Sequence, residues 1–400
     1  MPDAVIVATG RTPIGRAMKG SLVSCRPDDL SAHVIREVLA KVPQLDPAQV
    51  EDVMLGCGQP AGEAGYNVAR VAALLAGMDV PGVTVNRYCS SSLQTIRMAA
   101  HAIWSGEGHA FVAAGVETVS RFQFGASDTG PHNPAFADAE ARTAERAPAV
   151  TEPWTPPPGL GDIYIAMGQT AENVAEYEKV GREEMDEYAL LSQNRAVESQ
   201  KNGFFEREII PVTLADGTVV TLDDGPRPDT TLEKLASLKP AFREGGKVTA
   251  GNACPLNDGA AAVIVMSDTK ANELGITPLA RIVASGVSAL DPEIMGLGPI
   301  EACRQTLGRA EMTIDDIDLV EINEAFAAQV IPSARHLGIP WEKLNVKGGS
   351  IALGHPFGMT GARIMTTLLN ALEDEGKRFG LESMCVGGGQ GMAMIVERLS

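Results

Sequence analysis

The sequence has few aromatic residues, few basic residues and no long apolar run, and these shortages exclude several classes of protein. Phe, Trp and Tyr make up 4% of the 400 residues. No segment approaches the roughly 18 consecutive apolar residues of a membrane-spanning helix, so we predict no membrane span. Lys and Arg number 33 against 51 Asp and Glu, which gives a net charge of −18. Nucleic-acid binding needs a basic surface, so we predict no nucleic-acid partner.

Cysteine is also scarce, and its spacing excludes a disulfide scaffold. The six Cys residues include no CxxC pair, which is typical of reduced thiols in a cytosolic enzyme. The six His residues are scattered and form no HExxH motif, so we predict no metal site. The N-terminal stretch MPDAVIVATG lacks the features of a signal or transit peptide, and we therefore expect a cytoplasmic protein.

Short apolar runs alternate with amphipathic stretches at both ends of the chain. This pattern predicts an α/β protein with a parallel-rich sheet that is covered on both faces. Two segments, LDPAQVEDVMLG at 45–56 and MTIDDIDLVEIN at 312–323, resemble each other, which indicates an internal duplication. The expected strands are 4–9, 50–56, 83–85, 110–115, 280–285, 319–322, 384–386 and 392–397. The expected helices are 28–41, 67–77, 91–105, 298–307, 324–337 and 361–374.

A different kind of sequence separates the two repeats. Residues 121–160 are rich in Pro, Gly and small polar residues and predict loops, residues 168–202 predict a pair of helices, and residues 211–247 again predict loops. Within 227–247 the bases outnumber the acids, so this stretch is either a solvated loop or a patch for an anionic ligand. The five bases are Arg227, Lys234, Lys239, Arg243 and Lys247.

The segment NRYCSSSLQ at 86–94 places Cys89 between a strand and a helix. The positive end of the helix dipole and free backbone N–H groups at that point predict a lowered thiol pKa and donors for an oxyanion. For a single Cys at such a junction, the alternative is a small buried apolar side chain.

Three further segments contain polar residues at the ends of expected strands. GGSIALGHPFGMTGAR at 348–363 holds His355 in a glycine-rich loop, where it is either a base or oxyanion donor or a histidine bonded by the backbone. CVGGGQGMAMIVE at 385–397 predicts a hairpin turn, because a strand follows its glycines, and it leaves Cys385 at a strand end. NEAFA at 323–327 places Asn323 before a helix, where a helix cap is the alternative role.

Taken together and in this order, these segments resemble the thiolase family of coenzyme A-dependent enzymes. The resemblance covers essentially the whole chain, from RTPIG at 11–15 to the last strand. The further matching stretches are MGQTAENVA at 167–175, TTLEKLASLKPAF at 230–242, VTAGNACPLNDGAAA at 248–262 and MGLGP at 295–299.

The resemblance implies the thiolase fold, in which two duplicated α/β halves form a five-layer αβαβα arrangement with an inserted loop domain. On this chain the N-terminal half would be residues 1–120, completed by 248–272. The inserted domain, 121–247, would lie over coenzyme A, and 273–400 would be the C-terminal half. The resemblance also implies a homodimer or homotetramer.

The resemblance further implies an acyltransferase that cleaves 3-ketoacyl-CoA with CoA into acetyl-CoA and a shortened acyl-CoA, or condenses them in reverse, through an acyl-cysteine. Cys89 matches the nucleophile, His355 the histidine that activates it, and Cys385 the second, acid–base cysteine. Asn323 matches the asparagine that holds a water in one oxyanion hole, and the N–H groups of Cys89 and Gly387 match the other. CoA and acyl-CoA are the implied partners, with CoA as a substrate and no permanently bound cofactor.

Other positions match the family's substrate contacts. Arg227 and Lys234 match positions near the nucleotide, and Met167 and Met295 match methionines that line the acyl pocket, although ordinary core methionines are the alternative. The remaining implied substrate or CoA contacts are Ala250, Cys254 and Phe326.

Some positions depart from the family pattern. Ser92 stands where the family usually has a glycine. Cys254 and Pro255 stand where a serine and a glycine are frequent. Ala166 stands where acetoacetyl-specific members carry a histidine, which favours longer acyl groups and a role in fatty acid β-oxidation. An acetoacetyl-CoA-specific acetyl-CoA C-acetyltransferase is the alternative. A decarboxylating ketoacyl synthase is another alternative, but such enzymes typically use two catalytic histidines, whereas this chain offers His355 and Cys385 at those positions. A non-catalytic acyl-CoA or lipid carrier is disfavoured because all four chemical positions are present.

Overall fold

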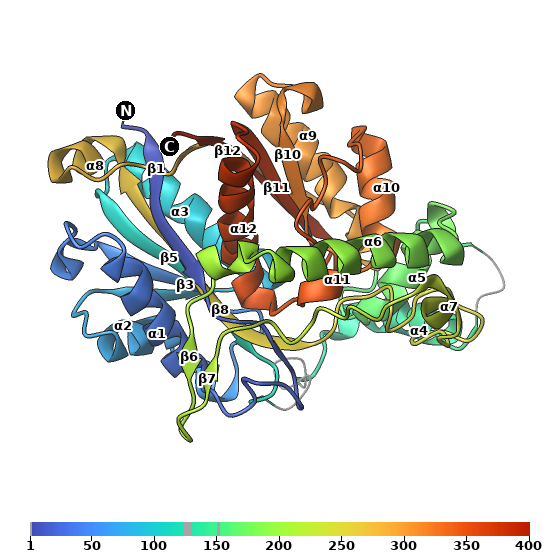
Figure 1. The fold of residues 1–400 in the computed structure, drawn as a ribbon. Helices are drawn as coiled ribbons and strands as arrows, with labels where there is room; N and C mark the ends of the chain where they lie inside the picture. The colour runs from blue at the N-terminus through green and yellow to red at the C-terminus, as the bar shows by residue number, and fades with distance from the viewer. Residues whose placement is uncertain (1, 123–129, 150–152) are drawn as a thin grey trace.

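The computed structural model describes residues 2–122, 130–149 and 153–400, and its strands run through the centre of the molecule (Figure 1). A 10-stranded sheet and a separate two-stranded hairpin make up the β structure of these residues. The strands of the N-terminal half are β1 (Ala4–Arg11), β2 (Gly15–Arg16), β3 (Asp52–Gly56), β4 (Gly82–Val85), β5 (Ala110–Thr118) and β8 (Asn257–Ser267). Those of the C-terminal half are β9 (Ala280–Ala289), β10 (Leu319–Ile322), β11 (Phe379–Val386) and β12 (Gln390–Arg398), and the hairpin is β6 (Val212–Thr213) with β7 (Val219–Val220).

The strand order shows the internal duplication that the sequence predicted. The order β3-β5-β8-β1 in one half matches β10-β11-β12-β9 in the other, and the pairing directions also match strand for strand. The two halves join where β1 and β9 pair antiparallel through two residue pairs, Val5 with Arg281 and Ile6 with Ala280. One continuous sheet therefore consists of two equivalent half-sheets.

The prediction of a mostly parallel sheet was wrong. Among the described strands, the parallel pairs are β3–β4, β3–β5 and β10–β11, and the other pairs are antiparallel. The long apolar strand β8 lies antiparallel between β1 and β5 and is buried along its whole length. A continuous apolar run reports burial on both faces, and it does not report strand direction.

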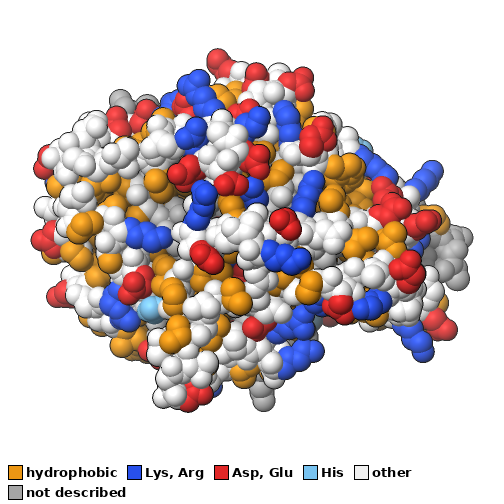
Figure 2. Space-filling view, viewed as in Figure 1, with side chains coloured by type: hydrophobic (Ala, Val, Ile, Leu, Met, Phe, Trp, Pro, Cys, Tyr) orange, Lys and Arg blue, Asp and Glu red, His pale blue; other side chains and the backbone are white. Residues whose placement is uncertain are grey.

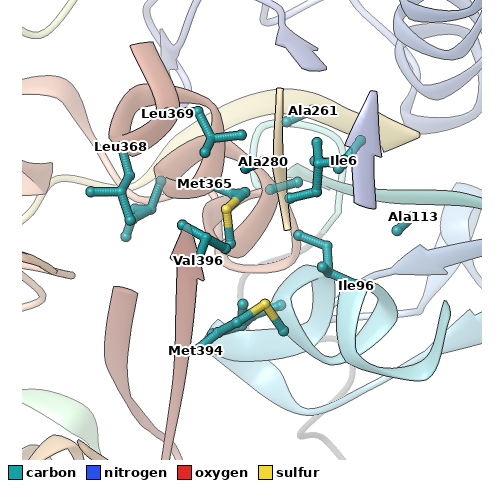
Figure 3. Packing of buried hydrophobic residues seen from close by; sticks show 14 of the residues in the cluster. Ile6, Ile96, Ala113, Ala261, Ala280, Met365, Leu368, Leu369, Met394 and Val396 are labelled. Atoms are coloured by element: carbon teal, nitrogen blue, oxygen red, sulfur yellow. The ribbon is translucent and has the colours of Figure 1, made fainter. Parts of the chain in front are cut away.

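Helices cover both outer faces and also fill the space between the half-sheets. Along β8, Val263 and Val265 point into a central apolar cluster, whereas Ile264 and Met266 point into an outer one. Figure 3 shows side chains of the central cluster, including Ile96 of α3 and Met365 of α12. This arrangement gives the five layers of the predicted thiolase fold. The central helices are α3 (Ser91–Ser105) and α12 (Thr360–Asp374), and the outer ones are α1 (Pro27–Ala40), α2 (Val68–Leu75), α9 (Gly298–Ala310) and α10 (Ala327–Leu337).

The stretch between the halves contains more helix than predicted. α5 (Met167–Tyr177) and α6 (Arg182–Lys201) confirm the expected helical pair. α4 (Ala137–Arg146) and α7 (Leu232–Ala236) form where loops were predicted, while residues 123–129 and 150–152 lie outside the described part of the chain. The remaining helices are α8 (Asp268–Leu274) and α11 (Ser350–Leu353). None of the helices in the described ranges combines the length and the apolar character needed to cross a bilayer.

Candidate active site

Cys89 lies at the point where the two central helices begin. It belongs to the 3-10 turn Tyr88–Ser90 that leads into α3, and this turn contacts both the turn Phe357–Met359 before α12 and the end of β11. The backbone N–H groups of Gly387 and of Cys89 itself donate to the Cys89 sulfur. The sulfur of Cys89 is thus surrounded by two helix N-termini and two backbone donors.

The predicted lowering of the Cys89 pKa was wrong. Burial raises the pKa of this thiol to about 11, and the two N–H donors oppose the shift only in part. The cost of placing a thiolate in a dry site exceeds the stabilisation by the helix N-terminus and the backbone donors. A thiol with this pKa is about one part in ten thousand ionised at pH 7, so its reaction requires a base.

His355 is the candidate for that base, and its hydrogen bonds define which ring nitrogen is free. Burial and the nearby Arg363 charge lower the pKa of His355 to about 3, so the ring is neutral. Its Nδ1 lies 2.6 Å from Oγ1 of Thr360, whose hydroxyl donates to the Pro356 carbonyl at 2.8 Å. Since the hydroxyl hydrogen is already donated, Nδ1 must donate to Thr360, and Nε2 therefore holds the lone pair.

Asn323 follows β10 directly and faces the free nitrogen of His355. Its Nδ2 lies 3.3 Å from His355 Nε2, and its Oδ1 accepts a 2.6 Å hydrogen bond from Ser350. Its backbone N–H donates to the Ser383 carbonyl. The predicted helix 324–337 begins only at Ala327, because the backbone of Phe326 forms a bridge with Ala253 beside the site.

Three cysteine thiols lie near one another at this site. Cys385 ends β11 and is fully buried. Burial raises its pKa well above the usual range, and the charges of Cys89 and Cys254 raise it further. Cys254 is half-buried, and burial together with Cys89 raises its pKa as well. An ionised Cys89 therefore disfavours the ionisation of Cys254 and Cys385.

The glycine turn predicted at 387–389 is confirmed. β11 and β12 form an antiparallel hairpin in which Val386 pairs with Gln390. Gly388 and Gly389 both have a φ of +78°, a conformation that favours glycine. The turn brings Gly387 to Cys89 and explains why three glycines follow Cys385.

Several residues implied as substrate or CoA contacts lie near one another, and Met167 packs against the apolar cluster that contains Met295. A Cβ atom on Gly387 would be 3.8 Å from the sulfur of Met167, so Met167 borders the Cys89 site. Met295 and Phe326 belong to the same apolar cluster as Cys385. Ala250 is exposed.

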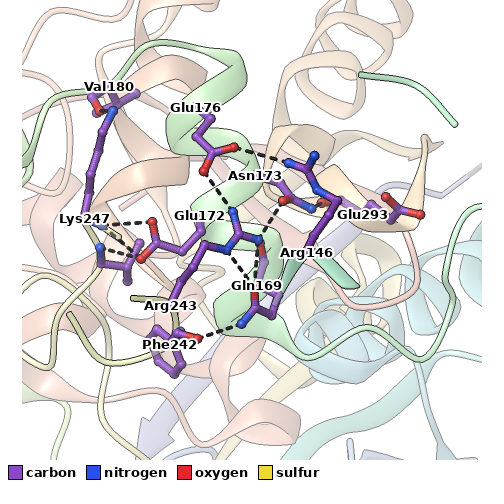
Figure 4. A network of polar contacts seen from close by, with 11 residues as sticks. Arg146, Gln169, Glu172, Asn173, Glu176, Val180, Phe242, Arg243, Lys247 and Glu293 are labelled. Carbon is purple, nitrogen blue, oxygen red and sulfur yellow. Dashed lines mark hydrogen bonds and ion pairs between the residues drawn. The ribbon is translucent and has the colours of Figure 1, made fainter. Parts of the chain in front are cut away.

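The proposed anionic patch of five bases is largely used for structure. Arg243 is buried and bonds Glu176, Gln169 and Asn173 on α5 (Figure 4). The Lys247 ammonium donates to the Val180 carbonyl. Two of the five bases therefore hold the insertion together.

The other three bases are more exposed. Lys234 forms an exposed ion pair with Asp229 at 2.7 Å, and Lys239 is exposed. Arg227 is half-buried beside Arg16, and its Nε atom is buried without a hydrogen-bond partner among the described residues. Of the five, Arg227 has the clearest unused capacity for an anion. On the face shown in Figure 2, acidic and basic side chains are interspersed around α6.

Sequence reasoning missed several residues that hold the site together. Thr360 and Ser350 orient His355 and Asn323, as described above. Glu117 on β5 accepts hydrogen bonds from the backbones of Gly58, Gln59 and Gly358, and burial raises its pKa to about 7. The available signals were an acid in the apolar run AFVAAGVET and a hydroxyl five residues after the histidine. No cluster of metal-ligating side chains occurs in the parts of the chain that the structure describes.

Two family models together match nearly the whole chain. The model of the thiolase N-terminal domain matches residues 4–269, and that of the thiolase C-terminal domain matches residues 276–398. A 3-oxoadipyl-CoA/3-oxo-5,6-dehydrosuberyl-CoA thiolase of Escherichia coli strain K12 is 44% identical over 409 residues, which covers 100% of both chains. A 3-ketoacyl-CoA thiolase of Vibrio vulnificus strain CMCP6 is 42% identical, again over 100% of both chains.

The fold has a matching solved structure. An acetyl-CoA acetyltransferase of Bacillus anthracis superposes with a TM-score of 0.86 and is 40% identical. The match covers 100% of this chain and 99% of the other.

Proposed function

Because the chain belongs to the thiolase family, we propose that it is an acyltransferase that cleaves 3-ketoacyl-CoA with CoA through an acyl-cysteine intermediate. The observation that supports this most directly is the packing of the Cys89 turn against the end of β11, which carries Cys385, and against the turn that follows His355. His355 and Asn323 lie 3.3 Å apart, and the Gly387 N–H donates to the Cys89 sulfur. CoA and acyl-CoA are the substrates, and the reverse reaction is a Claisen condensation at the same site.

The first half of the reaction forms the acyl-enzyme. The Cys89 sulfur attacks the 3-keto carbon while its proton passes to Nε2 of His355. The N–H groups of Cys89 and Gly387 stabilise the resulting oxyanion. Cleavage of the carbon–carbon bond leaves an acyl-cysteine and the enolate of acetyl-CoA, whose carbon takes the Cys385 proton. A water held by Asn323 stabilises the enolate oxygen, so each developing charge has a donor.

The second half returns the protons. CoA gives its thiol proton to the Cys385 thiolate, and the CoA sulfur attacks the acyl-cysteine carbonyl. Cys89 leaves and takes back its proton from His355. The raised pKa of Cys385 suits this cycle, because a weakly acidic thiol gives a strong base once it is deprotonated.

We propose 3-ketoacyl-CoA with acyl groups longer than acetoacetyl as the preferred substrate, as in fatty acid β-oxidation. Ala166 is small and exposed next to Met167, so it leaves room at the entrance to the acyl pocket. The names of the relatives include both 3-oxoadipyl-CoA and 3-ketoacyl-CoA thiolases, while the structural neighbour is an acetyl-CoA acetyltransferase. An acetoacetyl-specific acetyltransferase is therefore the second candidate.

We also propose that residues 121–247 form an inserted domain over CoA, between the half formed by 1–120 with 248–272 and the half formed by 273–400. The unused Nε of Arg227 supports a contact with the nucleotide phosphates. Lys234 is less suited, because Asp229 already pairs with it. Exchange of Arg227 for Ala should raise KM for CoA more than the same exchange of Lys234.

The test of this function is thiolysis by the purified chain. The ratio kcat/KM is measured for acetoacetyl-CoA, a medium-chain 3-ketoacyl-CoA and 3-oxoadipyl-CoA, with Cys89→Ala as the inactive control. A preference for the medium chain supports the argument from Ala166, whereas a preference for acetoacetyl-CoA refutes it. If no substrate is cleaved and no acyl-enzyme is seen by mass spectrometry, a non-catalytic acyl-CoA carrier replaces the proposal.

We further propose a homodimer or homotetramer in the cytoplasm. Tyr66, 87% exposed, and the exposed Leu74 and Leu75 lie close together in sequence, around α2, which is unusual for a surface that faces only water. The cysteines are free, which suits a reducing compartment. Light scattering after size exclusion measures the assembly directly.

A further inference from the structure

Behind Asn323 runs a chain of hydrogen bonds that starts at a buried arginine. An Nη2 group of Arg363, on α12, donates to Oγ of Ser350 at 3.0 Å. The Ser350 hydroxyl donates in turn to Oδ1 of Asn323 at 2.6 Å. With Oδ1 accepting, the Nδ2 group of Asn323 must point toward Nε2 of His355, at 3.3 Å. Every donor in this chain points the same way, toward the reacting histidine.

The arginine at the start of the chain is buried, and Nη2 makes its bond to Ser350 while Nε and Nη1 have no partner among the described residues. Arg363 is almost fully buried among Glu321 and Glu382, which pair side by side on the parallel strands β10 and β11. Neither carboxyl oxygen of Glu382 has a hydrogen-bond partner in the described structure. Burial lowers the pKa of Arg363, and the charges of Glu321 and Glu382 oppose that shift and favour the guanidinium form. A charged donor strengthens the hydroxyl that it contacts.

We propose that Arg363 and Ser350 are positioning residues that hold the Asn323 amide with its N–H group toward His355 and the enolate oxygen. An amide is nearly symmetric in shape, so packing alone does not choose between its two orientations. In the reversed orientation the Asn323 oxygen would face the enolate oxygen and would repel the charge that must form there. The inference rests on the proposed function and adds to it a reason for the activity of Asn323.

Arg363 itself is a poor target, because its removal would leave Glu321 and Glu382 buried without a positive charge. Ser350→Ala removes only the hydroxyl. We expect it to lower kcat for thiolysis about tenfold, a fraction of the loss of roughly a hundredfold or more that removal of an oxyanion donor causes, with KM changed less than twofold. Ser350→Cys, which retains a weak donor, should lose less. The matched control is Ser31→Ala, since the buried Ser31 hydroxyl donates only to the Pro27 carbonyl of α1.

A double-mutant cycle separates this role from a general loss of stability. In the Asn323→Ala background, Ser350→Ala should change kcat less than twofold, because its effect passes through the amide. A Ser350→Ala variant with near wild-type kcat, or one that loses a further tenfold without Asn323, would overturn the proposed positioning role. If Asn323→Ala itself keeps the wild-type kcat, the assignment of Asn323 in the proposed function fails and the positioning role fails with it. If Ser350→Ala does not fold, Ser350→Cys is compared with the wild type in both backgrounds by the same criteria.

Discussion

The hydroxyl of Thr360 makes a specific prediction about the chemistry of His355. Thr360→Val keeps the shape and burial of the side chain but removes the acceptor of the Nδ1 hydrogen. The buried Nδ1–H is then left without a partner, which costs about 1–3 kcal/mol. The ring can avoid this cost by moving its hydrogen to Nε2, the nitrogen that accepts the Cys89 proton in the proposed mechanism.

The size of the effect follows from that cost. A penalty of about 2 kcal/mol corresponds to roughly thirtyfold in kcat, since about 1.4 kcal/mol is tenfold. KM should change little, because the hydroxyl lies behind the ring. The low pKa of His355 means that the ring stays neutral between about pH 5 and 9, so the change concerns the position of one hydrogen.

The assay compares steady-state thiolysis of Thr360→Val with that of Thr366→Val. Thr366 lies on the same helix, is equally buried and donates only to the Ala362 carbonyl at 2.8 Å. Nitrogen-15 NMR of the His355 ring should show loss of the Nδ1–H form in the first variant alone. A kcat within twofold of wild type for Thr360→Val, or equal losses in both variants, would refute the assignment of the lone pair to Nε2.

Three further results are expected. Alkylation of Cys89 in the free enzyme should accelerate about tenfold per pH unit from pH 7 to 10, because its pKa is about 11, and a plateau below pH 8.5 would contradict the burial argument. Arg243→Met should lower the free energy of unfolding in urea by about 3 kcal/mol while KM for CoA stays constant, since Arg243 bonds α5; a raised KM would restore it to the CoA site. Ala166→His should lower kcat/KM for a medium-chain substrate about tenfold relative to acetoacetyl-CoA, whereas an equal effect on both would remove Ala166 from chain-length selection.

Much of the fold could be predicted from the sequence, because local patterns report burial well. The junction at Cys89, the hairpin after Cys385 and the repeated order of elements all follow from apolar runs and the residues that end them. Strand direction could not be predicted in the same way. β8 was not among the expected strands, and its antiparallel place between β1 and β5 depends on the path of the inserted residues.

The site shows a similar division between what local sequence determines and what packing determines. The sequence gives a thiol at a helix N-terminus, but the sign of its pKa shift depends on how much of the protein covers it. Arg243 and Lys247 are charged residues in a loop-like stretch, and only the structure shows that α5 and its neighbours use them. Thr360 and Ser350 are small polar residues, and only the structure shows that they bond His355 and Asn323.

The antiparallel contact of β1 with β9 suggests how the two halves of the chain are related. Equivalent edge strands that pair antiparallel form the kind of contact that relates the two subunits of a twofold dimer. The chain can therefore be understood as two fused copies of a half-length ancestor around a pseudo-twofold axis. Each copy directs the start of its central helix toward that axis, one with Cys89 and the other with the loop of His355. Fusion allows two such copies to diverge, so that in the proposed mechanism one supplies the nucleophile and the other its base.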